Sequence, residues 1–161
     1  MNKIFLSIAV CFLVSCSTSK YYIVRHAEKE AATTMNQDVL LTDAGKQRAI
    51  ALKDKLKGKH IAHIYSTNFA RTKATALPLN VATGVPIETY NPGDASFITK
   101  LKNLPKGNVL IVSHSNTVDD IVNGLTGKNL LKDLDDTAYG DLFIIKKKKD
   151  NYTLQTKHFG K

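Results

Sequence analysis

The chain has 161 residues, 43% of them hydrophobic, so it is long enough to form one domain with a sizeable core. Its 23 Lys and Arg residues against 14 Asp and Glu give a formal net charge of +9, which suits an anionic substrate or an anionic membrane surface. Trp is absent, aromatic residues are few, and no GxGxxG, P-loop or Cys-rich metal motif occurs, which argues against nucleic-acid, dinucleotide and structural zinc binding.

The first sixteen residues predict an export signal. Lys3 precedes an apolar run over residues 4–14, which is too short to span a bilayer. The run closes with residues 13–16, Leu-Val-Ser-Cys, which resemble the lipobox of bacterial lipoproteins. The alternative is an ordinary cleaved signal in which Cys16 is incidental.

The lipobox implies that Cys16 is lipidated and holds the protein in the cell envelope, on the extracytoplasmic side of a bacterial membrane. The expected divisions are a signal peptide over residues 1–15, a lipidated tether over residues 16–19 and a domain over residues 20–161. Both cysteines, Cys11 and Cys16, precede this domain, so it contains neither a disulfide nor a thiolate metal site.

The first predicted strand ends in two polar side chains. Residues 21–24 are aromatic and β-branched, and Arg25 and His26 follow them directly. In open α/β sheets ligands bind at the carboxyl ends of strands. A neutral imidazole there can attack an electrophile, and a guanidinium can hold phosphate oxygens. An isolated Arg-His pair is more often part of a surface loop.

Residues 29–40 show no clear period and predict a loop over the site. Thr42 then fits a helix N-cap, with Asp43 in the favourable first turn. The helix keeps a narrow face small or apolar, at Gly45, Ala49, Leu52 and Leu56.

The middle of the chain alternates strands and helices. Residues 61–66 and 86–90 predict strands, and between them residues 68–79 predict a helix limited by Pro78. A further helix begins at Asp94. Its apolar face consists of Phe97, Ile98, Leu101 and Leu104.

Residues 109–112 form a continuous apolar run, as expected of a strand covered on both faces, and deliver Ser113 and His114. The next helix carries Val118, Ile121, Val122 and Leu125 on one side. Residues 140–146 and 152–158, joined by a turn at Asp150-Asn151, predict an antiparallel hairpin at the sheet edge. The whole pattern favours a three-layer α/β/α sandwich with a mostly parallel central sheet and a C-terminal antiparallel hairpin.

Four segments in this order resemble the histidine phosphatase superfamily, in the branch that includes the phosphoglycerate mutases. They are residues 21–29, 41–45, 65–72 and 112–116, and the likeness runs from about Tyr21 to at least Val122. The resemblance implies that His26 is the nucleophile and forms a phosphohistidine that water hydrolyses. It also implies that Arg25 and Arg71 clamp the phosphate and that His114 donates a hydrogen bond to the same phosphoryl group.

This cluster of cations should keep His26 neutral through like-charge repulsion. Each residue alone has a plain structural explanation: Arg71 fits an exposed helix charge, and His114 a hydrogen-bonded residue after a strand. No metal or cofactor is expected, because His60 and His63 lack a third ligand nearby and fit surface or packing roles.

The proton donor is where the sequence departs from the family. In better-known mutase-like members a glutamate after the third strand protonates the leaving group, within an insertion that this chain lacks. Asp94 is the candidate here, although an N-cap role explains it equally. Glu88 and Glu28 are alternatives, and Glu28 could instead pair with Arg25 or Lys29.

The predicted function is that of a metal-independent phosphomonoesterase that acts outside the cytoplasm on a small phosphorylated substrate. A mutase is disfavoured because the chain has little room for the mutases' longer insertions. The alternatives are a protein-phosphohistidine phosphatase and a non-catalytic lipoprotein that binds phosphate or other anions.

Overall fold

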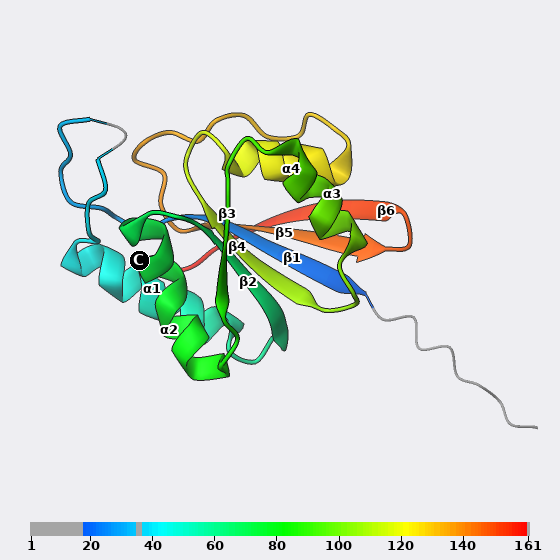
Figure 1. The fold of residues 1–161 in the computed structure, drawn as a ribbon, viewed down its shortest axis with the longest axis horizontal. Helices are drawn as coiled ribbons and strands as arrows, with labels where there is room; N and C mark the ends of the chain where they lie inside the picture. Colours follow the sequence, from blue (N-terminus) through cyan, green and yellow to red (C-terminus); the bar gives the residue numbers. More distant parts are fainter. Residues whose placement is uncertain (1–17, 35–36, 161) are drawn as a thin grey trace, which may run out of the picture.

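A computed structural model describes residues 18–34 and 37–160. Within them, six strands form one sheet with two helices on each face (Figure 1). The strands are β1 (Ser19–Arg25), β2 (Ile61–Thr67), β3 (Ile87–Tyr90), β4 (Asn108–Ser113), β5 (Asp141–Lys148) and β6 (Asn151–His158). The helices are α1 (Asp43–Leu56), α2 (Ala70–Thr83), α3 (Ala95–Asn103) and α4 (Val118–Thr126).

The strand order is β3-β2-β4-β1-β5-β6. The first four strands are parallel, with β1 paired to β4, β4 to β2 and β2 to β3. Strand β5 pairs antiparallel with both β1 and β6. Helices α1 and α2 cover one face of the sheet, and α3 and α4 cover the other (Figure 1). The predicted three-layer sandwich with a mostly parallel sheet and a C-terminal hairpin is confirmed.

Two hydrophobic cores lie on opposite faces of the sheet because successive side chains of a strand point to opposite sides. In β1, Tyr21 and Ile23 pack with α3 and α4, whereas Tyr22 and Val24 pack with α1 and α2. The central strands β1 and β4 are therefore buried on both faces, which explains their unbroken apolar runs.

Helix α1 begins as expected. The hydroxyl of Thr42 accepts a hydrogen bond of 3.1 Å from the backbone N–H of Gly45. The buried face consists of Gly45, Ala49, Leu52 and Leu56, the set that the sequence predicted. This face fixes α1 against the loop that follows β1.

The expected end of α2 near Pro78 is wrong. The helix continues through Pro78 to Thr83 and ends at Gly84, whose φ of 71° is left-handed and whose N–H donates to Asn80 O. A proline within a helix removes one hydrogen bond. Burial of Leu79, one residue further on, offsets that loss and keeps the helix on the sheet.

The hairpin turn also differs from expectation by one residue. Strands β5 and β6 leave Lys149 and Asp150 between them, and Lys149 takes a left-handed φ of 55°.

The predicted signal peptide and the lipidated Cys16 lie outside the described residues. No helix in residues 18–34 and 37–160 is both long and apolar enough to cross a membrane.

Candidate active site

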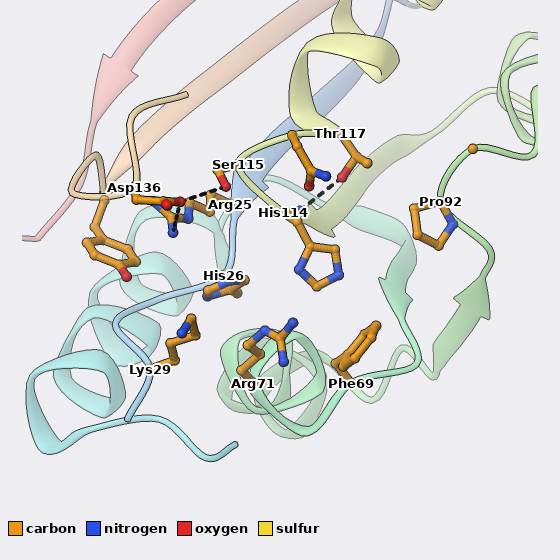
Figure 2. Close-up of a pocket in the computed structure, with 13 residues that line it drawn as sticks. Arg25, His26, Lys29, Phe69, Arg71, Pro92, His114, Ser115, Thr117 and Asp136 are labelled. Atoms are coloured by element: carbon orange, nitrogen blue, oxygen red, sulfur yellow. Dashed lines mark hydrogen bonds and ion pairs between the residues drawn. The ribbon is translucent and has the colours of Figure 1, made fainter. Parts of the chain in front are cut away.

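The carboxyl ends of the parallel strands open into a cavity of about 470 Å³ (Figure 2). It brings together the four side chains that the family resemblance singled out: Arg25, His26, Arg71 and His114. They come from the end of β1, the first turn of α2 and the end of β4. Parallel strands meet at one edge, so residues far apart in the sequence converge there.

His26 is held rigidly at the end of β1. Its backbone N–H donates to Ser113 O at 2.9 Å, which continues the pairing of β1 with β4. The residue is 3% exposed, and Nδ1 lies 2.8 Å from Ala27 O. Because a carbonyl oxygen only accepts, this hydrogen bond places the proton on Nδ1. Nε2 of the neutral ring then carries a free lone pair.

The surroundings of His26 lower its pKa to about 3. Burial is the largest cause, and the charges of Arg25, His114 and Arg71 act in the same direction. The hydrogen bond to Ala27 O opposes them by favouring the protonated ring. The imidazole is therefore neutral at neutral pH, as a nucleophile requires.

Arg25 is fixed by the segment between α4 and β5. Its Nη1 donates to Asp135 O at 2.9 Å and to Ala138 O at 3.3 Å, and Nη2 lies 3.4 Å from Asp136 Oδ1. The guanidinium stacks over the ring of Tyr139, with Cζ 4.4 Å from the centroid. These contacts hold the positive charge beside His26.

Arg71 is fixed from the opposite side. Its Nη1 donates to Gln37 O at 3.0 Å, and its Cζ lies 4.3 Å from the ring centroid of Phe69. Like Arg25, it has a buried Nε–H that makes no hydrogen bond to the residues described. Each guanidinium therefore has one buried donor without a partner among the described residues.

His114 faces His26 in an edge-to-face arrangement, with ring centroids 5.4 Å apart. Its Nε2 lies 2.9 Å from Thr67 Oγ1, which in turn donates to Thr72 Oγ1 at 2.9 Å, so the ring orientation is set by the end of β2. Burial, together with the charges of Arg71 and Arg25, lowers the pKa of His114 to about 4.

The three acids considered as proton donors do not line this cavity. Asp94 caps α3 by accepting from Ser96 N at 2.8 Å, and hydrogen bonds from the side chain and then the backbone of Ser96 lower the pKa of its carboxyl group. Its position favours the capping role. Glu88 pairs with Lys100 at 3.1 Å.

Glu28 does not pair with Arg25 or Lys29, the two partners considered from the sequence. It binds Arg48 of α1 through three hydrogen bonds of 2.6, 2.8 and 2.9 Å. The sequence around Arg48 does not indicate this contact, because the two residues meet only when α1 packs on the loop after β1.

Several lining residues were missed from the sequence. Phe69, Asp136 and Tyr139 also face the cavity, whereas Lys29, which lines it too, begins the loop that was predicted to lie over the site. Asp136 is the one carboxylate among the described lining residues, and it accepts from Ser115 Oγ at 3.1 Å (Figure 2). Residues 128–139 have no regular periodicity, so no pattern linked Asp136 or Tyr139 to the site.

Across the described ranges, no group of three or more His, Cys, Asp and Glu residues is placed to hold a metal ion. His60 is exposed to solvent. The ring of His63 stacks on Tyr65, with centroids 6.1 Å apart, and Nδ1 lies 3.9 Å from Glu88 Oε1. Both positions fit the surface and packing roles expected for them.

Comparison with known proteins gives a family match over part of the chain and a shared fold. The model of the histidine phosphatase superfamily (branch 1) matches residues 21–91, a range that includes Arg25, His26 and Arg71. No curated protein matches the chain.

Several of the similar solved structures are phosphatases by name. A candidate phosphohistidine phosphatase, SixA, from Nakamurella multipartitia is 20% identical, with a TM-score of 0.66 over 89% of this chain and 98% of that chain. The protein histidine phosphatase SixA in complex with tungstate is 19% identical, with a TM-score of 0.67 over 86% and 96%. A mycobacterial glucosyl-3-phosphoglycerate phosphatase is 13% identical, with a TM-score of 0.70 over 89% and 100%.

At these identities the structures establish a shared fold, and the family model adds the sequence pattern of the first half of the domain. Together they support the prediction that the chain is a phosphatase. Over residues 21–91, less than half of the 161-residue chain, the sequence matches the histidine phosphatase superfamily (branch 1), and the described domain shares the fold of the solved phosphatases.

Proposed function

We propose that the protein is a metal-independent phosphomonoesterase that works through a phosphohistidine at His26. The observation that carries this proposal is the state of His26: a buried, neutral imidazole with its proton on Nδ1 and its Nε2 lone pair free, beside two arginines. Such a ring is a nucleophile without needing a base to remove a proton.

The reaction takes two displacements at phosphorus. The Nε2 lone pair of His26 forms a bond to phosphorus while the ester P–O bond breaks, and the bonding electrons leave with the ester oxygen, which takes up a proton. Water then attacks the phosphohistidine, the N–P bond breaks, and the neutral ring and inorganic phosphate are released. Arg25 and Arg71 stabilise the negative charge on the equatorial oxygens in both steps. His114 donates to the same group when its Nε2–H turns from Thr67 Oγ1 to a phosphoryl oxygen.

Two alternatives remain. A protein-phosphohistidine phosphatase is favoured by the position of Asp94, Glu28 and Glu88 outside the cavity, because a labile phosphoryl bond depends less on a dedicated acid than an alkyl ester does. Asp94 stays a predicted proton donor for the ester reaction. A non-catalytic, phosphate-binding lipoprotein would use the same arginines without turnover.

We also propose that the protein is lipid-anchored at Cys16 on the extracytoplasmic side of a bacterial membrane. The support is the sequence of residues 1–16, a short apolar run closed by a lipobox-like segment. This location makes a small phosphorylated molecule the favoured substrate over a cytoplasmic phosphoprotein.

The test is turnover by the domain purified from residue 17 onward. We expect hydrolysis of 4-nitrophenyl phosphate that is insensitive to chelators and that is lost in His26→Ala, whereas the exposed control His60→Ala keeps it. A panel of phosphorylated metabolites and a phosphohistidine-bearing protein then separates the two catalytic candidates. Phosphate binding without turnover would favour the non-catalytic alternative.

A further inference from the structure

A second cavity, of about 280 Å³, adjoins the first. The two share three lining residues, Pro92, Gly93 and Thr117, so they meet along one wall. Figure 2 shows Pro92 on the side of the first cavity away from Lys29. The second cavity therefore adjoins the first on the side where a group extending past Pro92 from a phosphate at His26 would lie.

The second cavity is walled mainly by apolar side chains. The rings of Tyr90 and Phe97 are stacked, with centroids 4.0 Å apart, and both line it. Ile98 and Ile121 complete this wall from α3 and α4. A hydrocarbon or aromatic group gains free energy by leaving water for such a surface.

The two cavities differ in charge. The first is lined by three cations, Arg25, Lys29 and Arg71. The second is lined by two carboxylates, Asp94 and Asp120, and by no Lys or Arg among the described residues. An elongated molecule that fills both therefore meets positive charge at one end and negative charge at the other.

We propose that the second cavity binds the leaving group of the substrate, and that this group is an apolar spacer ending in an ammonium group. The inference rests on the proposed function and narrows it to zwitterionic phosphate monoesters, the class of phosphorylated amines. Apolar contact with Tyr90 and Ile121 binds the spacer, and Asp120 attracts the ammonium. A leaving group that ends in a carboxylate is repelled by the same two acids.

The test uses three aryl phosphates that differ only in a distant charge. They are the phosphate esters of tyramine, of 3-(4-hydroxyphenyl)propionate and of the corresponding amide. Two methylenes separate each charge from the ring, so the phenol leaving groups are closely matched and the chemical step is nearly constant. We expect kcat/KM to be highest for the ammonium and lowest for the carboxylate, by about tenfold between them at low ionic strength. Added salt should shrink this ratio.

A substitution at the acidic rim tests the source of the preference. Asp120→Asn keeps the size of the side chain and removes its charge, and it should lower the ammonium-to-carboxylate ratio about threefold. The matched control is Asp133→Asn, an exposed acid that lines neither cavity, which should leave the ratio unchanged. An equal ratio in wild type and Asp120→Asn would contradict the role of Asp120.

A second variant tests occupancy without relying on charge. Ala95 lines the second cavity at the exposed start of α3, so Ala95→Trp fills space there without entering the core. It should lower kcat/KM for phosphotyramine at least fivefold and leave acetyl phosphate, which reaches only the first cavity, unaffected. Loss for both substrates alike would indicate damage to the site and overturn the assignment.

The outcomes separate the two proposals. Hydrolysis of all three esters at equal rates, unaltered by Ala95→Trp, would leave the phosphatase function intact and overturn the leaving-group site. Failure to hydrolyse any ester, including 4-nitrophenyl phosphate, would overturn the proposed function and with it the inference that rests on it.

Discussion

The neutrality of His26 and His114 makes the stability of the protein depend on pH. Burial lowers their pKa to about 3 and about 4 in the folded state, while an unfolded histidine titrates near 6.5. Between these values the unfolded chain binds protons that the folded chain does not, so acidification favours unfolding. The contribution is at most about 1.4 kcal/mol per histidine for each pH unit.

We therefore expect the free energy of unfolding to fall as pH drops from about 6.5 toward about 4. Urea denaturation at pH 7.5 and pH 5.5 measures this slope. His26→Asn and His114→Asn should each flatten it, whereas His60→Asn, at an exposed position outside the cavity, should not. An equal slope in the His26 variant would show that this ring titrates normally.

The two arginines give a second prediction at the residue scale. Removing Arg25 or Arg71 should cost about 2–4 kcal/mol of transition-state stabilisation. Lysine should restore little of it, because a point charge cannot hold two phosphate oxygens as a planar guanidinium does. The measurement is kcat/KM, with Lys73→Ala in the same helix as the control cation. If kcat/KM of Arg71→Ala falls by less than about tenfold, which corresponds to about 1.4 kcal/mol, Arg71 does not stabilise the transition state and acts only as a surface charge.

Site residues next to a recognisable strand or helix end could be predicted, and those on irregular segments could not. Arg25 ends an apolar strand, and His26 and His114 each directly follow one, which placed all three at one edge of the sheet. Asp136 contacts Arg25 from a segment without periodicity, 111 residues further along the chain. Such a contact depends on how the chain crosses the sheet edge, and no local pattern encodes it.

At the scale of elements, the close approach of α1 to the loop after β1 supports the site. A Cβ added at Gly45 would collide with the carbonyl oxygen of Glu28, two residues after His26. Glu28 is in turn bound to Arg48 of the same helix. Helix α1 therefore fixes the backbone on which the proposed nucleophile stands.

Gly45→Ala should destabilise the protein by about 1–3 kcal/mol, because the helix or the loop must move to relieve the overlap. It should also lower kcat, since the displacement reaches His26. Gly58→Ala is the matched control, because a Cβ there meets nothing within 4 Å. Unchanged denaturation midpoint and turnover in Gly45→Ala would show that α1 is free to shift without effect on the site.

Most strands and helices could be predicted from the sequence, because the apolar residues of each buried face recur with the spacing typical of a helix or a buried strand. The apolar run of β4 and the faces of α1 and α4 were confirmed residue by residue. The end of α2 was not, because burial of Leu79 outweighs the local penalty of Pro78. Tertiary packing decides such boundaries, and it is not visible in a local window.

At the scale of the whole molecule, the proposed lipid anchor determines where the enzyme acts. Changing Cys16 to Ser removes the only thiol that a lipobox over residues 13–16 offers for lipidation. We expect the variant to leave the membrane fraction or to remain an unprocessed precursor. Fractionation of bacterial cells followed by mass measurement of the protein distinguishes these forms. Unchanged processing and membrane association in Cys16→Ser would contradict the anchor.

The central claim is that phosphoryl transfer passes through His26, and rapid quenching tests it most directly. Wild-type protein mixed with a ³²P-labelled aryl phosphate and quenched in base within milliseconds should carry label that is stable in base and lost in acid, as a phosphoramidate is. Peptide mapping should place the label on His26. Label on another residue, or full turnover in His26→Ala, would contradict the claim.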